Sequence, residues 1–374
     1  MGLASARKGE GTVSRKVAAA VLEGVESIAL QDFDRPPIGP DDALLKIEMA
    51  GVCGTDFHLF DGSLAVPMPI ILGHEILGHI AAVGARAGER YRVREGDRVA
   101  VESSVPCWSC EYCLTGAYRF CASKRGYGLH VPTTEPPALW GAMAEYMYLA
   151  PGSILHQVPP GMPAKRAVVA SIFANGIQWL RRQGDASTGD TIVIQGAGPQ
   201  GLAAAVIARE SGASQVIVTG LARDAARLEL ARIFGADHVV VADREDVVLR
   251  VAELTSGRFA DVVLDVTGSP GAIEASVLMV RRQGTLVLGG LTGRDTVTAL
   301  KLDRVVWNEI RLQGVFTKGA DAIVSAFDFL ETRGDRYPLD RMVSHVYPLA
   351  EAEAAIRAAG SLADDQFIKA AIAP

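Results

Sequence analysis

The segment T-I-V-I-Q-G-A-G-P-Q-G, residues 191–201, decides the fold of this chain. It joins an apolar strand to the pattern G-x-G-x-x-G and then to a helix expected at about 200–210. Gly196 permits a tight turn, Gly198 lets the backbone approach a pyrophosphate, and Gly201 allows close packing of the helix on the strand. The helix N-terminus faces that anion. A glycine-rich turn without a ligand is the alternative, but the strand–turn–helix context favours a dinucleotide site. The candidate cofactor-binding residues here are Gly196, Gly198, Pro199, Gln200 and Gly201.

Apolar strands and helices alternate on the C-terminal side of this segment. Regular alternation of buried strands with helices implies a doubly wound parallel sheet, the Rossmann architecture. The expected strands are 191–195, 215–219, 238–241, 261–265 and 285–288, and the expected helices include 200–210 and 224–234.

The stretch from about 17 to 160 has a different character. Short alternating segments such as 43–48, with turns at Gly-Pro and Pro-Pro pairs, indicate half-buried strands. This half is therefore expected to be β-rich, and residues 1–16 are interpreted as a tail. Beyond about Gly314 we expect helices near 320–332 and 350–359 and a terminal strand near 366–372.

The choice of cofactor is decided at the end of the second strand of the alternating half. An Asp or Glu about 20 residues beyond the glycine pattern would bind the ribose 2′-hydroxyl of NAD. Gly220 stands at that place, and Arg223 and Asp224 are the nearest charged residues. Loss of the acid beside an arginine favours NADP(H), with Gly220 and Arg223 as candidate cofactor-binding residues. Asp224 could still reach a 2′-hydroxyl if the loop bends back, so NAD(H) stays open.

Composition and charge exclude several classes of function. The chain has 374 residues, 49% of them hydrophobic, and a net charge of −6. A general nucleic-acid binder needs a basic surface, which this balance does not favour. No apolar run approaches the roughly 18 residues that span a bilayer, and residues 17–22 are too short for a signal peptide. We therefore expect a cytoplasmic protein without nucleic-acid or membrane partners.

The five cysteines give the first indication of a metal. Four of them are spaced C-x2-C-x2-C-x7-C, which is typical of a closed tetrahedral zinc site. An iron–sulfur cluster is the rival, but the ferredoxin pattern has a three-residue last gap followed by Pro, and here the gap is seven. Inert free thiols are the other alternative. The candidate structural-zinc ligands are Cys107, Cys110, Cys113 and Cys121.

A second group of ligand-type residues lies earlier in the chain. Cys53 and His74 are candidates for a catalytic zinc, which uses about three protein ligands and keeps one position open. Glu75 is either a ligand or a neighbour of the metal, and Thr55 and Asp56 could supply hydrogen bonds and proton transfer. Taken singly, such a Cys is more often a small core residue and such a His is more often simply hydrogen-bonded.

Together these patterns resemble the zinc-dependent medium-chain dehydrogenase/reductase superfamily, which includes alcohol, sorbitol and threonine dehydrogenases. The resemblance runs from about Lys16 to the C-terminus and rests on four motifs in order: C-G-T-D at 53–56, G-H-E at 73–75, the cysteines at 107–121 and G-A-G-P-Q-G at 196–201. It implies a GroES-like catalytic domain interrupted by a Rossmann domain. The implied division is a tail (1–16), a first catalytic segment (17–165), the NAD(P)-binding domain (166–314) and a return to the catalytic domain (315–374).

The resemblance also implies roles for single residues. Cys53 and His74 would ligate the catalytic zinc. Thr55 would relay the proton of the alcohol, and His58 falls where some alcohol dehydrogenases pass it to solvent. Lys369 matches a basic residue that contacts the cofactor phosphate in some members.

One position departs from the family pattern. The usual third zinc ligand lies five residues before a Gly, and counting back from Gly176 gives Ser171, a poor zinc ligand. Sorbitol-dehydrogenase-like members use the Glu of G-H-E instead. The resemblance therefore implies Cys53, His74 and Glu75 at the catalytic zinc, and two zinc ions per chain.

The implied function is reversible hydride transfer between NAD(P) and an alcohol, secondary or a polyol, whose oxygen binds the catalytic zinc. Two other functions stay open: a zinc-free quinone or enoyl reductase, and a non-catalytic NAD(P)-binding protein of the same fold. The expected partner is a small alcohol or carbonyl compound, and the resemblance implies a homodimer or homotetramer.

Four aromatic residues have two possible roles. They either line the cleft or a subunit contact, or belong to ordinary packing: Trp108, Tyr127, Trp140 and Phe316.

Overall fold

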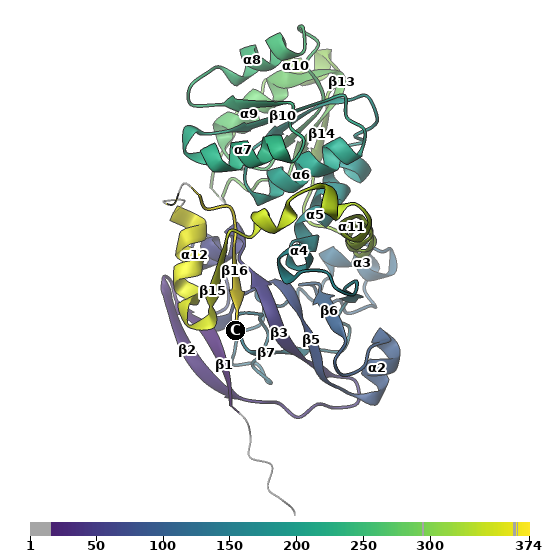
Figure 1. Cartoon of the computed structure of the whole chain (residues 1–374), viewed down its shortest axis with the longest axis vertical. Coiled ribbons are helices and arrows are strands. Elements are labelled where there is room, and N and C mark those ends of the chain that lie inside the picture. Colours follow the sequence, from purple (N-terminus) through teal and green to yellow (C-terminus); the bar gives the residue numbers. More distant parts are fainter. Residues whose placement is uncertain (1–15, 294, 362–363, 365) are drawn as a thin grey trace, which may run out of the picture.

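The computed structural model describes residues 16–293, 295–361, 364 and 366–374. The tail predicted at 1–16 therefore lies, except for Lys16, outside the described residues. Figure 1 shows a parallel sheet with its helices at one end of the molecule and a β-rich part at the other, with α4, α5 and α11 between them. No helix among the described residues is long and apolar enough to cross a membrane.

The strands are β1 (Lys16–Gly24), β2 (Ser27–Asp34), β3 (Ala43–Gly51), β4 (Ile70–Ile71), β5 (Glu75–Val83), β6 (Arg98–Val101), β7 (Tyr146–Leu149), β8 (Leu155–Gln157), β9 (Thr191–Gln195), β10 (Gln215–Gly220), β11 (His238–Val241), β12 (Ala260–Asp265), β13 (Val280–Leu288), β14 (Arg311–Gly314), β15 (His345–Pro348) and β16 (Ala370–Ala373). The α-helices are α1 (Gly54–Phe60), α2 (Ala85–Tyr91), α3 (Glu111–Leu114), α4 (Ala164–Val168), α5 (Ala170–Gly176), α6 (Pro199–Glu210), α7 (Ala225–Ile233), α8 (Val247–Leu254), α9 (Pro270–Met279), α10 (Leu302–Trp307), α11 (Ala320–Thr332) and α12 (Ala352–Ser361).

The nucleotide-binding half is a six-stranded sheet in the order β11-β10-β9-β12-β13-β14, with parallel neighbours throughout. All five residues of β9 are buried, as expected for a strand with helices on both faces. The chain leaves β9 to one side and reaches β12 on the other, so the strand order reverses there, where open α/β sheets bind ligands. The predicted fold class is confirmed.

The β-rich half contains a three-stranded sheet, β2-β1-β4, and a seven-stranded sheet along the path β15-β16-β3-β5-β6-β8, with β7 also paired to β3. The last strand, β16, pairs antiparallel with β3, so the end of the chain lies in the sheet formed by its beginning. This pairing brings Lys369, directly before β16, to the start of β5.

Helices and loops hold the two halves together. Phe173 of α5 stacks on Phe329 of α11 with ring centroids 5.5 Å apart. Arg227 of α7 is buried and donates from Nε to the carbonyl of Phe367 at 2.9 Å, which ties the nucleotide half to the C-terminal segment. Burial lowers the pKa of Arg227, and Asp224 opposes that shift.

Two differences from the expected secondary structure concern the elements near the candidate site. The terminal strand was expected at 366–372 but begins only at Ala370, because the preceding residues contact other parts of the chain. The β-rich half also contains helices, and α1 is the important one because it carries three candidate site residues. The strand predictions at 191–195 and 238–241 match β9 and β11.

Candidate functional site

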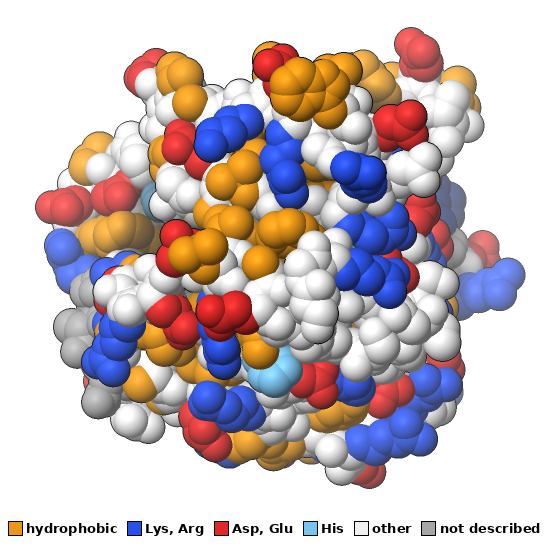
Figure 2. All heavy atoms as spheres, turned by 90° about the horizontal axis from the view of Figure 1, so that it is seen from above, with side chains coloured by type: hydrophobic (Ala, Val, Ile, Leu, Met, Phe, Trp, Pro, Cys, Tyr) orange, Lys and Arg blue, Asp and Glu red, His pale blue; other side chains and the backbone are white. Residues whose placement is uncertain are grey.

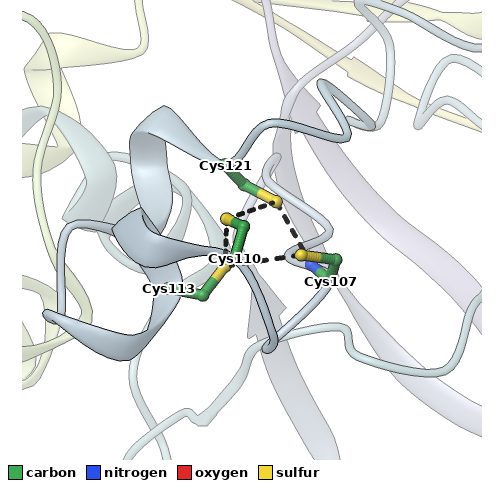
Figure 3. Close-up of side chains that lie close together, drawn as sticks. All are labelled: Cys107, Cys110, Cys113 and Cys121. Carbon is green, nitrogen blue, oxygen red and sulfur yellow. Dashed lines mark hydrogen bonds between the residues drawn. The ribbon is translucent and has the colours of Figure 1, made fainter.

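The four clustered cysteines converge in one small lobe (Figure 3). Their sulfur atoms all lie within 4.8 Å of one another. Cys110 Sγ is 3.6 Å from Cys113 Sγ and 3.9 Å from Cys121 Sγ, and Cys107 Sγ is 4.0 Å from Cys113 Sγ.

These distances fit one tetrahedral ion. Zinc–sulfur bonds of about 2.3 Å give sulfur–sulfur edges of about 3.8 Å in a regular tetrahedron. In an iron–sulfur cluster the thiolates bind different iron atoms, which places them farther apart. The backbone N–H of Cys107 also points to Cys121 Sγ at 3.2 Å, a donor suited to a thiolate.

Helix α1 positions the first candidates of the second site. Cys53 is its N-cap, and Asp56 in the first turn accepts from the Cys53 backbone N–H at 2.8 Å. Thr55 Oγ1 lies 3.8 Å from Cys53 Sγ. His58, one turn after Thr55 on the same face, is exposed and places Nδ1 3.1 Å from Ser63 Oγ.

His74 lies opposite the N-terminus of α1. Its Nδ1 is 3.2 Å from Oδ1 of the buried Asp56, which leaves Nε2 as the free nitrogen. Burial by itself would lower the pKa of His74, but Asp56 and Cys53 outweigh it and hold that pKa well above the usual value. Burial raises the pKa of Cys53, yet His74 outweighs that effect and the net pKa is lowered.

Glu75 and Lys369 pair with each other. Lys369 Nζ is 2.8 Å from Glu75 Oε2 and donates to the carbonyl of Val52, also at 2.8 Å. Both side chains are buried. Gly51 makes room for this pair, because a Cβ there would lie 2.1 Å from Glu75 Oε2.

The structure therefore gathers only part of the predicted catalytic set. Cys53 and His74 contact each other, and Asp56 orients His74 as a carboxylate orients a zinc-bound histidine. Glu75 stands apart with Lys369: among the described residues, the four cysteines are the only group of three or more Cys, His, Asp or Glu side chains with ligand atoms within 4.8 Å of one another. A thiolate, an imidazole and an orienting carboxylate fit the chemistry of zinc. The ligand role of Glu75 and the phosphate contact of Lys369 stay predictions.

Lys318 is a site residue that the sequence did not reveal. Its ammonium donates to Ser171 Oγ at 2.7 Å, and both residues line a small cavity of about 20 Å³ together with His74 and Glu75. Burial lowers the pKa of Lys318, and Glu102, Glu75 and Cys53 oppose that shift. A cation thus stands beside the position where the family pattern has a third metal ligand.

Glu102 is a second residue that sequence reasoning missed. It is buried, lines the same small cavity, and accepts from the Tyr118 hydroxyl at 2.8 Å. Its other oxygen lies 2.8 Å from His156 Nε2. No local pattern marks these residues, because three separate segments supply them.

The glycine turn has the expected geometry. Gly196 has φ of +108°, and a Cβ at Gly201 would lie 1.8 Å from the Gly196 carbonyl oxygen. Gly198 is the N-cap of α6, and a Cβ there would meet nothing within 4 Å. Pro199 is the first helical residue, and Gln200 follows it. The turn is packed against the protein at Gly196 and Gly201 and open at Gly198, as a pyrophosphate requires.

The residues at the end of β10 indicate which ribose substituent of the cofactor the chain can bind. Gly220 is buried, and a Cβ there would lie 3.0 Å from Leu228. Asp224 accepts from the Leu221 N–H at 2.9 Å and lies 3.2 Å from Arg227 Nη1, so its carboxylate is already engaged. Arg223 is exposed. The charged group free to meet a ribose substituent is therefore the Arg223 guanidinium.

Two family models match the chain. The alcohol dehydrogenase GroES-like domain matches residues 39–160, and the zinc-binding dehydrogenase domain matches residues 199–332.

Curated relatives match over most of their length. A protein of Mycobacterium tuberculosis named probable alcohol dehydrogenase is 39% identical over 344 residues, 90% of this chain and 92% of the relative. A sorbitol dehydrogenase of Bacillus subtilis is 32% identical and covers 88% of this chain and 92% of the relative. A D-arabitol-phosphate dehydrogenase of Enterococcus avium is also 32% identical, with coverage of 88% and 89%.

Solved structures show the same fold. An alcohol dehydrogenase of Thermotoga maritima superposes with a TM-score of 0.87 at 27% identity, covering 96% of this chain and 100% of that chain. A zinc-binding dehydrogenase of Sinorhizobium meliloti bound to NADP superposes with a TM-score of 0.86 at 26% identity, with the same coverage.

Proposed function

The chain belongs to the zinc-dependent medium-chain dehydrogenase/reductase superfamily and is an NAD(P)-dependent alcohol oxidoreductase, and from this premise we propose that Cys53 and His74 hold a catalytic zinc. The contact between these two residues, with Asp56 behind His74, is the observation that carries the proposal. When bound, zinc supplies Lewis acidity toward the oxygen of a secondary alcohol or polyol, or of the matching carbonyl compound. Ser171 leaves the third protein position to Glu75, once Lys369 releases it, or to water.

Thr55 and His58 form the proposed proton path. Thr55 lies beside Cys53, where it can accept the proton of the substrate hydroxyl. His58 stands one helical turn farther toward solvent and is exposed. The helix α1 holds both side chains on one face, because they are three residues apart.

NADP(H) is the proposed cofactor. The open side of Gly198 and the N-terminus of α6 would receive the pyrophosphate, and Arg223 would meet the 2′-phosphate. The buried Gly220 gives the ribose no acceptor, and Asp224 is engaged. The nicotinamide ring carries the hydride chemistry when bound.

We further propose that the four cysteines hold a structural zinc and that the chain forms a homodimer through the nucleotide-binding half. Among the described residues, the edge strand β14 has a partner on one side only, and apolar residues of α10 are exposed close to it in sequence. Figure 2, which looks onto the end of the molecule where α8 and α10 lie, shows hydrophobic side chains at the surface between charged ones.

Zinc content tests the proposal. Elemental analysis of the purified chain should give two zinc ions, Cys53→Ala should give one, and Cys110→Ala should lose the other. Substrate screening with NADP and NAD would follow. One zinc in both the unaltered chain and Cys53→Ala would remove the catalytic metal from the proposal, and the reductase or binding-protein alternatives would then take its place.

A further inference from the structure

A cavity of about 700 Å³ adjoins the candidate catalytic site. Tyr118 lines it, and the Tyr118 hydroxyl bonds to Glu102, which lines the small cavity beside His74. Phe316 also lines the large cavity, whereas Lys318, two residues later, lines the small one. The two cavities are therefore connected through contacts between their lining residues. We call the large one the outer chamber; its defining residues are Tyr112, Tyr118, Arg119, Phe120, Lys124 and Phe316.

Aromatic rings form one wall of the outer chamber. Phe120 of the cysteine lobe stacks on Phe316 of the segment between β14 and α11, with centroids 5.9 Å apart and an interplanar angle of 25°. The ring centroid of Tyr112 lies 6.2 Å from the ring centroid of Phe120. Phe316 is 60% exposed and Phe120 46% exposed, so both rings have free surface. Exposed apolar surface of this kind favours a ligand that covers it.

The charged residues of the outer chamber are all basic. No Asp or Glu is among its described lining residues, which include Arg119, Lys124, Arg125 and His130. Arg125 is paired with Glu135. Burial, together with Lys124, lowers the pKa of His130, which favours its neutral form.

Two cations are left to act on a ligand. Neither Arg119 nor Lys124 has a carboxylate within ion-pair distance in the part of the chain that the structure describes. Arg119 instead lies over the Phe120 ring, 4.9 Å from its centroid. This charge arrangement is complementary to an anion bound against the aromatic wall.

The size of the outer chamber is also informative. A volume of about 700 Å³ falls within the range that holds drug-sized ligands. A six-carbon polyol would leave most of this volume empty and would not cover the Phe120 and Phe316 rings.

We propose that the outer chamber binds the body of an alcohol substrate that carries an apolar or aromatic group ending in a carboxylate or phosphate. Phe120 and Phe316 cover the apolar group, and Arg119 and Lys124 meet the anion. The proposal rests on the proposed function, because it assigns the substrate class of the same site.

Direct binding tests the chamber separately from turnover. Calorimetric titration of the full chain, with zinc and NADPH present, should show tighter binding of 4-acetylbenzoate than of acetophenone by about three- to tenfold. The same titration with 4-acetylphenyl phosphate distinguishes a carboxylate site from a phosphate site. If binding shows this preference but neither ketone is reduced, the chamber stands and the proposed catalytic function fails.

Matched variants assign the effect to residues. The measurement compares kcat/KM for the acid 4-(1-hydroxyethyl)benzoate with kcat/KM for the neutral alcohol 1-phenylethanol. Lys124→Gln and Arg119→Gln should each lower kcat/KM for the acid about three- to tenfold, through a higher KM. Neither variant should change kcat/KM for 1-phenylethanol. Phe316→Ala should weaken both substrates. Lys46→Gln, an exposed lysine of β3, is the control and should change neither.

Two results would overturn the proposal. One is equal binding of 4-acetylbenzoate and acetophenone by the unaltered chain. The other is a preference for the acid that survives the Lys124→Gln/Arg119→Gln double variant, since the anion would then be bound elsewhere.

Discussion

At the scale of single residues, Lys318 has the largest consequence for the metal. Its ammonium is held by Ser171 and faces the same small cavity as His74 and Glu75. Most zinc sites collect negative ligands, whereas this one has a serine and a lysine at the third position. A zinc ion held by Cys53 and His74 is therefore expected to bind more weakly than one held by three protein ligands.

Replacing this cation should strengthen zinc binding. Lys318→Met removes an amino group whose protonated form would repel the ion from the small cavity that it shares with His74. We expect at least about tenfold tighter retention of the second zinc in competition with a chelator. The matched control is Lys46→Met. The gain should vanish when Cys53→Ala is combined with Lys318→Met, and a gain that persists there would show that the effect concerns the cysteine lobe.

The residue scale also shows where sequence reasoning ends. The four cysteines fall within 107–121, and the glycine turn within 196–201, so their local spacing predicted their convergence. Lys318 and Ser171 are 147 residues apart, and Lys369 and Val52 are 317 apart. Only the three-dimensional fold brings such pairs together, and no periodicity in the chain encodes them.

At the scale of elements, the β9–α6 turn separates the requirements of folding from those of cofactor binding. A Cβ at Gly201 would collide with the Gly196 carbonyl, whereas a Cβ at Gly198 would meet open space. Gly198 also has φ of −67°, which any residue adopts. Its glycine identity is therefore explained by the ligand and not by the fold.

Gly198→Ala should weaken the binding of the cofactor without lowering the stability of the fold. The added methyl group occupies the space through which a pyrophosphate approaches, so the Kd for NADPH in a fluorescence titration should rise at least about tenfold. The melting temperature should stay the same or rise slightly, as for Gly→Ala at an unstrained position. Gly271→Ala in α9, where the methyl group also meets open space, is the control. Unchanged NADPH binding by Gly198→Ala would contradict the cofactor site.

Glu210 at the end of α6 illustrates how two elements are joined by charge. It accepts from the Tyr337 hydroxyl at 2.9 Å and from Arg333 at 3.0 Å. Burial raises its pKa, but these donors and Arg336 outweigh burial and lower it. A depressed pKa in the folded state stabilises the fold above the unfolded value of about 4.3, and this contribution is lost as pH falls through the folded value.

Glu210→Gln should therefore destabilise the chain mainly at neutral pH. We expect a loss of about 1–2 kcal/mol at pH 7, discounted because both arginines are half exposed. Thermal unfolding should show a lower midpoint from pH 8 to about 5, and the gap from the unaltered chain should narrow as pH falls toward 4. Glu229→Gln, whose carboxylate is 62% exposed, serves as the control. A gap that widens on acidification would reverse the assigned sign.

Element prediction from the sequence succeeded best for two short apolar strands of the nucleotide-binding sheet. The strands β9 and β11 were predicted with their observed ends, because all-apolar runs bounded by polar or glycine residues leave few alternatives. The terminal strand was placed too early, since the apolar residues Phe367 and Ile368 continue the pattern although they contact the core outside the sheet. The π-helical turn Ile177–Gln183 after α5 had no sequence signal.

At the scale of the whole molecule, the end of the chain closes the catalytic half. The strand β16 joins β3, and with it comes Lys369, which pairs with Glu75 beside the candidate metal ligands. In the order of the chain, the nucleotide sheet is thus inserted between two parts of the seven-stranded sheet. This topology followed from the family resemblance and not from composition or periodicity, because a short terminal strand can pair with many edges.

Oligomer formation is the last property that belongs to this scale. In the part of the chain that the structure describes, no strand pairs with the outer side of β14, and α10 exposes Trp307 by 79% and Val306 by 71%. A monomer rarely leaves such a patch uncovered, so a second copy of the chain is expected to cover it.

Light scattering after size exclusion should give a multiple of 39.5 kDa for the unaltered chain. Trp307→Asp should shift the mass toward 39.5 kDa, because the carboxylate would be buried without a partner. Leu249→Asp on α8, at a position 64% exposed, should keep the larger mass. A monomer in the unaltered chain, or an undiminished mass in Trp307→Asp, would exclude this face as the subunit contact.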